Sequence, residues 1–243
     1  MSQNGYVDLT FGQNDDQLGS TIKRFKAKGG ESYRFTLAWW PVKEDGTLDM
    51  DTSTPRFKAA IRNYVKDVGY VVNHGPEFTK LIGEEGRAAI STVIIVWPTR
   101  DGLLDKEAFG KLQGEVMIWT ISKEKYNHLK KIAANGFPFG KFDLSADCTD
   151  TQYQKMTFSP CPENLLRNIL GAQKAKVKEW GAKLIEKITQ AGDRVESELA
   201  KNLTIQELKE RMSGSSGGNG PVAATGAVGT DDIDGMIDDV LES

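Results

Sequence analysis

The sequence predicts an α+β protein in which a small closed β-barrel with additional helices is followed by a C-terminal helical segment and a flexible acidic tail. Three observations support this prediction. Short runs of β-branched and aromatic residues alternate with turn residues between positions 31 and 160. Apolar residues recur at helical spacing from 161 to 212. Residues 213–243 contain six acidic residues and no lysine or arginine.

Charge is distributed unevenly along the chain. Its 243 residues include 31 lysines and arginines and 34 aspartates and glutamates, giving a formal net charge of -3. Removing the six acidic residues of 213–243 leaves 31 basic and 28 acidic residues, or +3, for residues 1–212. A mildly basic body therefore carries a strongly acidic end, which favours an anionic ligand for the body.

The composition also indicates where the protein functions. Charged residues make up 27% and hydrophobic residues 39% of the chain, as in soluble globular proteins. No apolar run reaches the roughly 18 residues that cross a bilayer, and the N-terminus lacks the pattern of a secretory signal. We expect a cytoplasmic protein (host cytoplasm if it is viral) that contacts no membrane. Cys148 and Cys161 are expected to be reduced structural thiols.

Residues 1–30 predict a loose N-terminal arm that ends in a basic patch. The patch consists of Lys23, Arg24, Lys26 and Lys28. Residues 31–41 alternate with period two and predict a strand, which places Tyr33 and Phe35 on one face and Arg34 and Trp40 on the other.

A helix is predicted from Pro55 to Gly69, because proline favours the first helical position and apolar residues follow at helical spacing. Lys58, Arg62 and Lys66 lie four residues apart, so they would form a basic stripe along this helix. The alternative is that they form an ordinary solvated helix flank.

The remaining elements of the barrel follow in order. Strands are predicted at 70–74, 90–98, 114–120, 139–144 and 153–158. A short helix is expected from Lys123 to Ala134, with Ser122 as its N-cap and Asn135-Gly136 at its end. Five or six short strands with a helix between them suit a small closed barrel, here spanning 31–160.

The C-terminal part divides into helices, a linker and a tail. Residues 161–212 predict helices that pack on the core, the last beginning at Thr204 with Glu207 in a capping box. Uncharged, Gly- and Ser-rich residues from 213 to 230 predict a flexible linker. The acidic end combines Asp231, Asp232, Asp234, Asp238 and Asp239 with Ile233, Met236, Ile237, Val240 and Leu241. Such a peptide is typical of a tail that docks on a partner protein, and a solubilising tail is the alternative.

Enzyme signatures are missing from the sequence. There is no dinucleotide-binding glycine motif, Walker loop or nucleophile elbow. His74, His128, Cys148 and Cys161 lack the short ligand spacing that structural zinc sites usually show. We therefore expect neither a metal nor another cofactor, although an unfamiliar active site would leave no motif.

Basic and aromatic residues together indicate binding to single-stranded nucleic acid, which needs cations for phosphates and flat side chains for bases. The candidate residues are Lys23, Arg24, Lys26, Lys28, Arg34, Trp40, Lys43, Lys58, Arg62, Lys66, Trp97, Arg100 and Trp119. Any one of these aromatic residues could instead belong to the core, so the prediction depends on their accumulation.

Three stretches also carry a family resemblance. They are Tyr33-Arg34-Phe35 through Trp40-Pro41-Val42-Lys43, then Tyr70-Val71-Val72-Asn73-His74-Gly75, and the acidic end from Asp231 to Glu242. The chain resembles the T-even bacteriophage helix-destabilising proteins, which bind single-stranded DNA through an oligonucleotide-binding (OB) fold. The resemblance implies an OB-fold-like barrel and a tail that recruits polymerase, helicase or primase.

The chain departs from this family in three places. The family's zinc subdomain is absent, because no cysteine lies between His74 and Cys148. The predicted helix at 55–69 has no counterpart in the family. The family's basic cooperativity motif is not matched cleanly by Lys23 to Lys28, so self-association on DNA stays open.

The expected function is to coat unpaired strands during phage DNA replication, recombination and repair, without catalysis. Two alternatives stay open: a transcription or host-takeover factor whose tail binds RNA polymerase, and an interaction or scaffold protein whose aromatic residues are all core. The sequence leaves open the preference for DNA or RNA.

Overall fold

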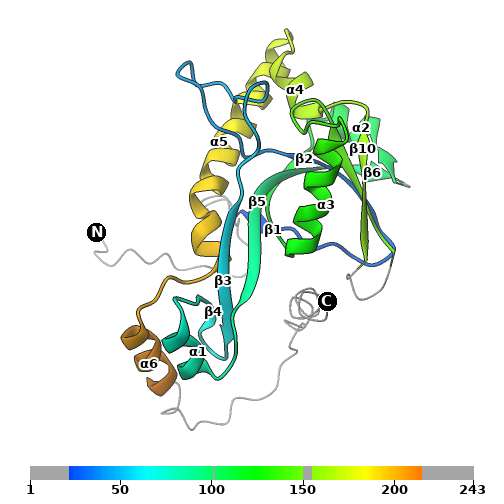
Figure 1. Cartoon of the computed structure of the whole chain (residues 1–243). Helices are drawn as coiled ribbons and strands as arrows, with labels where there is room; N and C mark the ends of the chain where they lie inside the picture. Colours follow the sequence, from blue (N-terminus) through cyan, green and yellow to red (C-terminus); the bar gives the residue numbers. More distant parts are fainter. Residues whose placement is uncertain (1–21, 101, 150–154, 215–243) are drawn as a thin grey trace, which may run out of the picture.

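The computed structural model describes residues 22–100, 102–149 and 155–214 (Figure 1). Within these residues the chain forms a mixed β-sheet and six helices, which confirms the α+β class. In sheet order, the main strands are β1 (Lys23–Arg24), β8 (Glu115–Ile121), β5 (Arg87–Trp97), β2 (Ser32–Leu37), β9 (Asp143–Cys148) and β10 (Met156–Cys161). A separate hairpin is formed by β6 (Thr99–Arg100) and β7 (Leu103–Leu104).

Strand β5 is the centre of the sheet, and its run of β-branched residues is almost entirely buried, as a two-sided strand requires. One side of β5 pairs with β8. Its other side is shared, because β2 pairs with residues 94–97 and β3 (Lys58–Val65) pairs with residues 87–91. Strand β3 continues into a hairpin with β4 (Gly69–Val72).

The sheet is strongly curled. The ring centroids of Trp119 on β8 and Phe158 on β10 lie 5.7 Å apart, and Phe35 on β2 contacts both rings. Three strands separate β8 from β10, so a flat sheet would hold these two strands roughly 19 Å apart. The face that carries these three rings is therefore concave.

Helices cover both faces. The helices are α1 (Pro76–Ile82), α2 (Lys106–Gly110), α3 (Lys123–Ala134), α4 (Leu165–Leu170), α5 (Ala175–Leu199) and α6 (Ile205–Gly214). Helix α3 lies on the concave side, where His128 contacts Phe158. Helix α5 lies on the convex side, where Trp180 packs against Trp97. Figure 1 shows β5 running between these two helices.

A small lobe extends from one end of the sheet, where Figure 1 shows β4, α1 and α6 together. It has its own core, made of Val65, Val68, Val71, Phe78, Leu203 and Leu208. The chain after α5 joins this lobe, because Lys201 pairs in parallel with Val71 on β4. The C-terminal helix α6 then buries Leu208 in the lobe core.

Strand β10 is the last strand of the sheet, and its outer edge lacks one of the N–H donors that a further strand would need. The Thr149 N–H donates to the Lys155 carbonyl, so the backbone groups of Met156, Phe158 and Pro160 point away from β9. Proline has no N–H, so Pro160 removes one donor from the outer edge of β10.

Two architectural expectations were wrong. The sheet is curled but is not a closed barrel, because β1 and β10 end the strand order without pairing with each other. Residues 55–69 form strand β3 and the turn after it instead of a helix. Their apolar spacing also fits a strand, and pairing with β5 and β4 decides between the two structures.

Other boundaries needed smaller corrections. Residues 22–30 are no loose arm, since they include β1 and bury Ile22, Phe25 and Ala27. The last two strands begin three or four residues later than predicted, and Ser213 and Gly214 belong to α6.

Several local predictions were confirmed. Ser122 caps α3 by accepting from the Lys125 N–H. Thr204 and Glu207 form the reciprocal bonds of a capping box at α6. Cys148 and Cys161, both within the described residues, form no disulfide.

Candidate nucleic-acid interface

The three tryptophans predicted to stack on bases lie in the core. Trp40, Trp97 and Trp119 are 2%, 1% and 2% exposed. Trp40 donates its indole N–H to the Leu37 carbonyl at 2.7 Å. A side chain this deeply buried cannot offer a face to a base, so their assignment as stacking surfaces is corrected.

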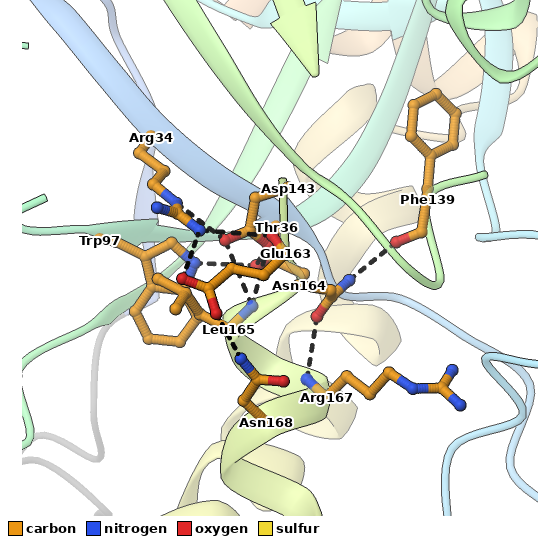
Figure 2. Close-up of polar contacts among 10 residues, drawn as sticks. All are labelled: Arg34, Thr36, Trp97, Phe139, Asp143, Glu163, Asn164, Leu165, Arg167 and Asn168. Carbon is orange, nitrogen blue, oxygen red and sulfur yellow. Dashed lines mark hydrogen bonds and ion pairs between the residues drawn. The ribbon is translucent and has the colours of Figure 1, made fainter. Parts of the chain in front are cut away.

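Trp97 belongs to a buried polar network centred on Asp143 (Figure 2). Its indole N–H donates to Thr36 Oγ1 at 2.8 Å, and the Thr36 hydroxyl donates to the Asp143 carboxylate. The Leu165 N–H at the start of α4 lies 3.3 Å from both carboxylate oxygens. The network thus joins β2, β5, β9 and α4.

Arg34, another predicted nucleic-acid ligand, is also part of this network. Its Nε donates to Asp143 Oδ2 at 3.0 Å, and its Nη2 donates to the Glu163 carbonyl at 3.3 Å. The Arg34 side chain is only 12% exposed and Asp143 is fully buried. A phosphate could reach this arginine only by replacing a buried carboxylate, so Arg34 belongs to the interior of the fold and its assignment as a nucleic-acid ligand is wrong.

Burial raises the pKa of Asp143 to about 6, although its hydrogen bonds with Thr36 and Arg34 act in the opposite direction. Desolvation of the carboxylate is the larger effect. This perturbed group lies in a packed interior and not in a cleft, so it is no candidate for acid–base catalysis.

Most other predicted cations already have carboxylate partners. The ion pairs are Lys23–Glu115, Arg24–Glu198, Lys28–Glu31, Lys43–Asp49, Lys58–Glu196 and Arg100–Asp105. Arg62 is buried, donates to the Leu199 carbonyl and stacks on the Tyr70 ring. Lys26 and Lys66 are exposed and form no ion pair with a described carboxylate.

A different surface combines open cations with aromatic rings. On α3, Lys123, Tyr126 and Lys130 are spaced three and four residues apart, so they share one flank of the helix. The Tyr126 ring lies 5.0 Å from that of Phe57, just before β3, and Lys130 Nζ lies 5.2 Å from the Tyr126 centroid. Ile61, on the same side of β3 as Phe57, is 49% exposed. We call these five residues the α3–β3 surface.

The charges of this surface are not neutralised within the described part of the chain. Lys123 and Lys130 form no ion pair there, and Phe57 and Tyr126 are half-buried. Helix α3 contains four lysines and one glutamate, a net +3, and β3 has no acidic residue. Helix α5, on the other face, contains five cations and five acids and is neutral. Of these two helices, α3 on the concave side therefore carries the excess of positive charge.

The sequence carries one signal for this surface, because residues 123–142 hold five lysines and one glutamate. Helix or strand periodicity alone does not detect this excess of charge. The helix predicted at 55–69 gives no reason to place Phe57 beside Tyr126. Only the pairing of β3 with β5 brings these two rings together.

The comparisons with known proteins found no match: no protein-family model, curated protein or solved structure matches the chain. The acidic tail from Asp231 to Leu241 lies outside the described residues. Among the described helices, none is both long and apolar enough to cross a membrane.

Proposed function

We propose that this protein binds and coats single-stranded DNA through the α3–β3 surface, during phage DNA replication, recombination and repair. The proposal is carried by one observation: Lys123 and Lys130, which form no ion pair with a described carboxylate, lie beside the half-buried rings of Tyr126 and Phe57. The lysines would contact phosphates, and the rings of Tyr126 and Phe57 would offer edges or faces to bases. Contacts of both kinds form with any base sequence, so this binding requires no sequence preference. We also propose that the curled sheet is OB-fold-like, with α3, which covers its concave side, facing the strand.

The proposed mechanism is sequestration without chemistry. A protein that binds only unpaired strands lowers duplex stability by mass action. The acidic tail, whose composition suits partner docking, would recruit replication proteins such as polymerase, helicase or primase.

The test is a titration of fluorescently labelled oligo(dT), followed by anisotropy at several salt concentrations. For single strands, each phosphate contact contributes roughly -0.7 to the slope of log K against log salt. Replacing Lys123 and Lys130 with alanine should reduce the magnitude of that slope by about 1.4. The matched control is the replacement of Lys176 and Lys187, two exposed lysines of α5, which should leave the slope unchanged.

The aromatic contribution needs a separate variant. Tyr126→Leu keeps an apolar side chain against Phe57 but removes the ring, and should weaken binding by about 1–3 kcal/mol. Equal slopes for the α3 and α5 variants would place the binding surface elsewhere.

The burial of Trp40, Trp97 and Trp119 favours a second candidate, an interaction or scaffold protein whose aromatic residues are core. No anisotropy change with oligo(dT) at low salt would support this candidate and refute strand binding.

A further inference from the structure

A second pair of aromatic rings lies beyond the C-terminal end of α3. Gly136, with φ 94°, reverses the chain after the helix, and the Phe137 N–H returns to the Ile132 carbonyl. Phe137 is 38% exposed, and its ring centroid lies 5.4 Å from that of Phe142 in an edge-to-face arrangement. Neither ring belongs to the hydrophobic cores of the sheet or the small lobe.

The surroundings of this pair are basic. Lys131, in the last turn of α3, and Lys141, next to Phe142, are both exposed and form no ion pair with a described carboxylate. No aspartate or glutamate occurs from Lys125 to Phe142. Single exposed phenylalanines are common on protein surfaces. Two in contact, flanked by open lysines, have the composition of a stacking site on a nucleic-acid path.

The loop that carries the pair is firmly held. The Asn164 side chain donates to the Phe139 carbonyl at 2.8 Å, and Arg167 donates to the Gly140 carbonyl at 3.3 Å. Gly140 also lies so close to the Met50 carbonyl that an added Cβ would be 1.9 Å from its oxygen. The rings therefore project from a fixed segment, which lowers the entropy cost of stacking a base on them.

We propose that Phe137 and Phe142 form a second base-stacking site, which extends the strand path from the α3–β3 surface along α3. This proposal rests on the proposed function. Eight of the eleven positions from Tyr126 to Phe137 lie in α3, which corresponds to roughly 12 Å along the helix before Gly136 reverses the chain. A stacked strand advances roughly 3.4 Å per nucleotide, so the two sites are about four nucleotides apart. A ligand that engages both sites must be a single strand of about five or more nucleotides.

The test compares oligo(dT) of 4, 8 and 12 nucleotides, because a spacing of roughly four nucleotides leaves the shortest unable to engage both sites. Wild-type protein should bind the two longer oligonucleotides much more tightly than the shortest. Phe137→Leu should weaken binding of the longer two by roughly five- to hundredfold and leave the shortest nearly unchanged. Leu103→Ala, which changes another strongly exposed apolar residue, is the control and should alter no affinity.

A variant that removes charge tests the second stacking site independently. Replacing Lys131 and Lys141 with alanine should reduce the salt slope for the 12-mer by about 1.4 and leave the slope for the 4-mer unchanged. Thermal unfolding of every variant identifies any loss of fold.

The outcomes separate the two proposals. If Tyr126→Leu weakens binding at every length while both Phe137→Leu and the lysine variant match wild type at 12 nucleotides, the second site is overturned and strand binding stands. If wild-type protein binds no oligonucleotide at low salt, the proposed function fails and this inference fails with it. Length-dependent losses in both variants would establish the second site.

Discussion

Replacing Asp143 with alanine should lower the free energy of unfolding by about 3 kcal/mol, the low end of the range for breaking a buried ion pair. The carboxylate is fully buried and accepts hydrogen bonds from Thr36, Arg34 and Leu165. Its loss leaves the guanidinium of Arg34, 12% exposed, without its closest carboxylate. The Glu163 side chain, 3.8 Å away, retains part of the electrostatic interaction and limits the loss.

The assay is urea unfolding followed by tryptophan fluorescence, because Trp97 reports on this network through Thr36. A double variant, Arg34→Met with Asp143→Leu, removes both charges and should be less destabilised than Asp143→Ala alone. A loss below about 1 kcal/mol for the single variant, with an unchanged m-value, would show that the ion pair contributes little to stability.

The same carboxylate predicts a pH dependence. Burial raises the pKa of Asp143 from 3.8 to about 6, so between these values the folded protein binds more protons than the unfolded chain. The contribution of this group is then most favourable below about pH 4 and decreases until the pH exceeds 6. The decrease is about 3 kcal/mol, since each pKa unit corresponds to roughly 1.36 kcal/mol. The stability difference between wild type and Asp143→Asn should follow this curve, and a flat difference from pH 4 to 7 would refute the role of desolvation.

Two further predictions concern packing. Compared with a chain that ends at residue 214, a chain that ends at residue 203 lacks α6 and should show increased hydrogen exchange throughout β4, because the lobe core loses Leu208. Equal exchange in the two truncations would contradict the role of α6. Gly192→Ala should cost about 1–3 kcal/mol, because its Cβ would lie 2.5 Å from Trp39 Nε1. Gly110→Ala, with open space around it, is the control, and similar midpoints for the two variants would contradict a close contact at Gly192.

Elements with strong local signals could be predicted from the sequence. The cap at Ser122, the capping box at Thr204 and the alternation of 32–37 depend on residues within one turn or one strand. The wrong prediction of a helix at 55–69 has the opposite cause, because the structure of this segment depends on residues far away in the sequence. Its apolar residues fit both periods, and the decisive partner, residues 87–91 of β5, lies some thirty positions further along the chain.

The candidate site shows the same limit. Tryptophans that lie near cations in the sequence were predicted to stack on bases, but Trp97 and Trp119 are buried and cannot contact a ligand. The ion pair between Arg24 and Glu198 joins residues 174 positions apart, so no local pattern could show that this cation is already occupied. A count of net charge per element, which requires no tertiary contact, would have identified α3.

The blocked strand edges limit how copies of this protein would pack side by side under the proposed function. Lys201 occupies the side of β4 that β3 leaves free, and Pro160 interrupts the outer side of β10. Neither edge can accept a neighbouring molecule as an uninterrupted additional strand. A filament of this protein would therefore grow without main-chain ladders through β4 or β10.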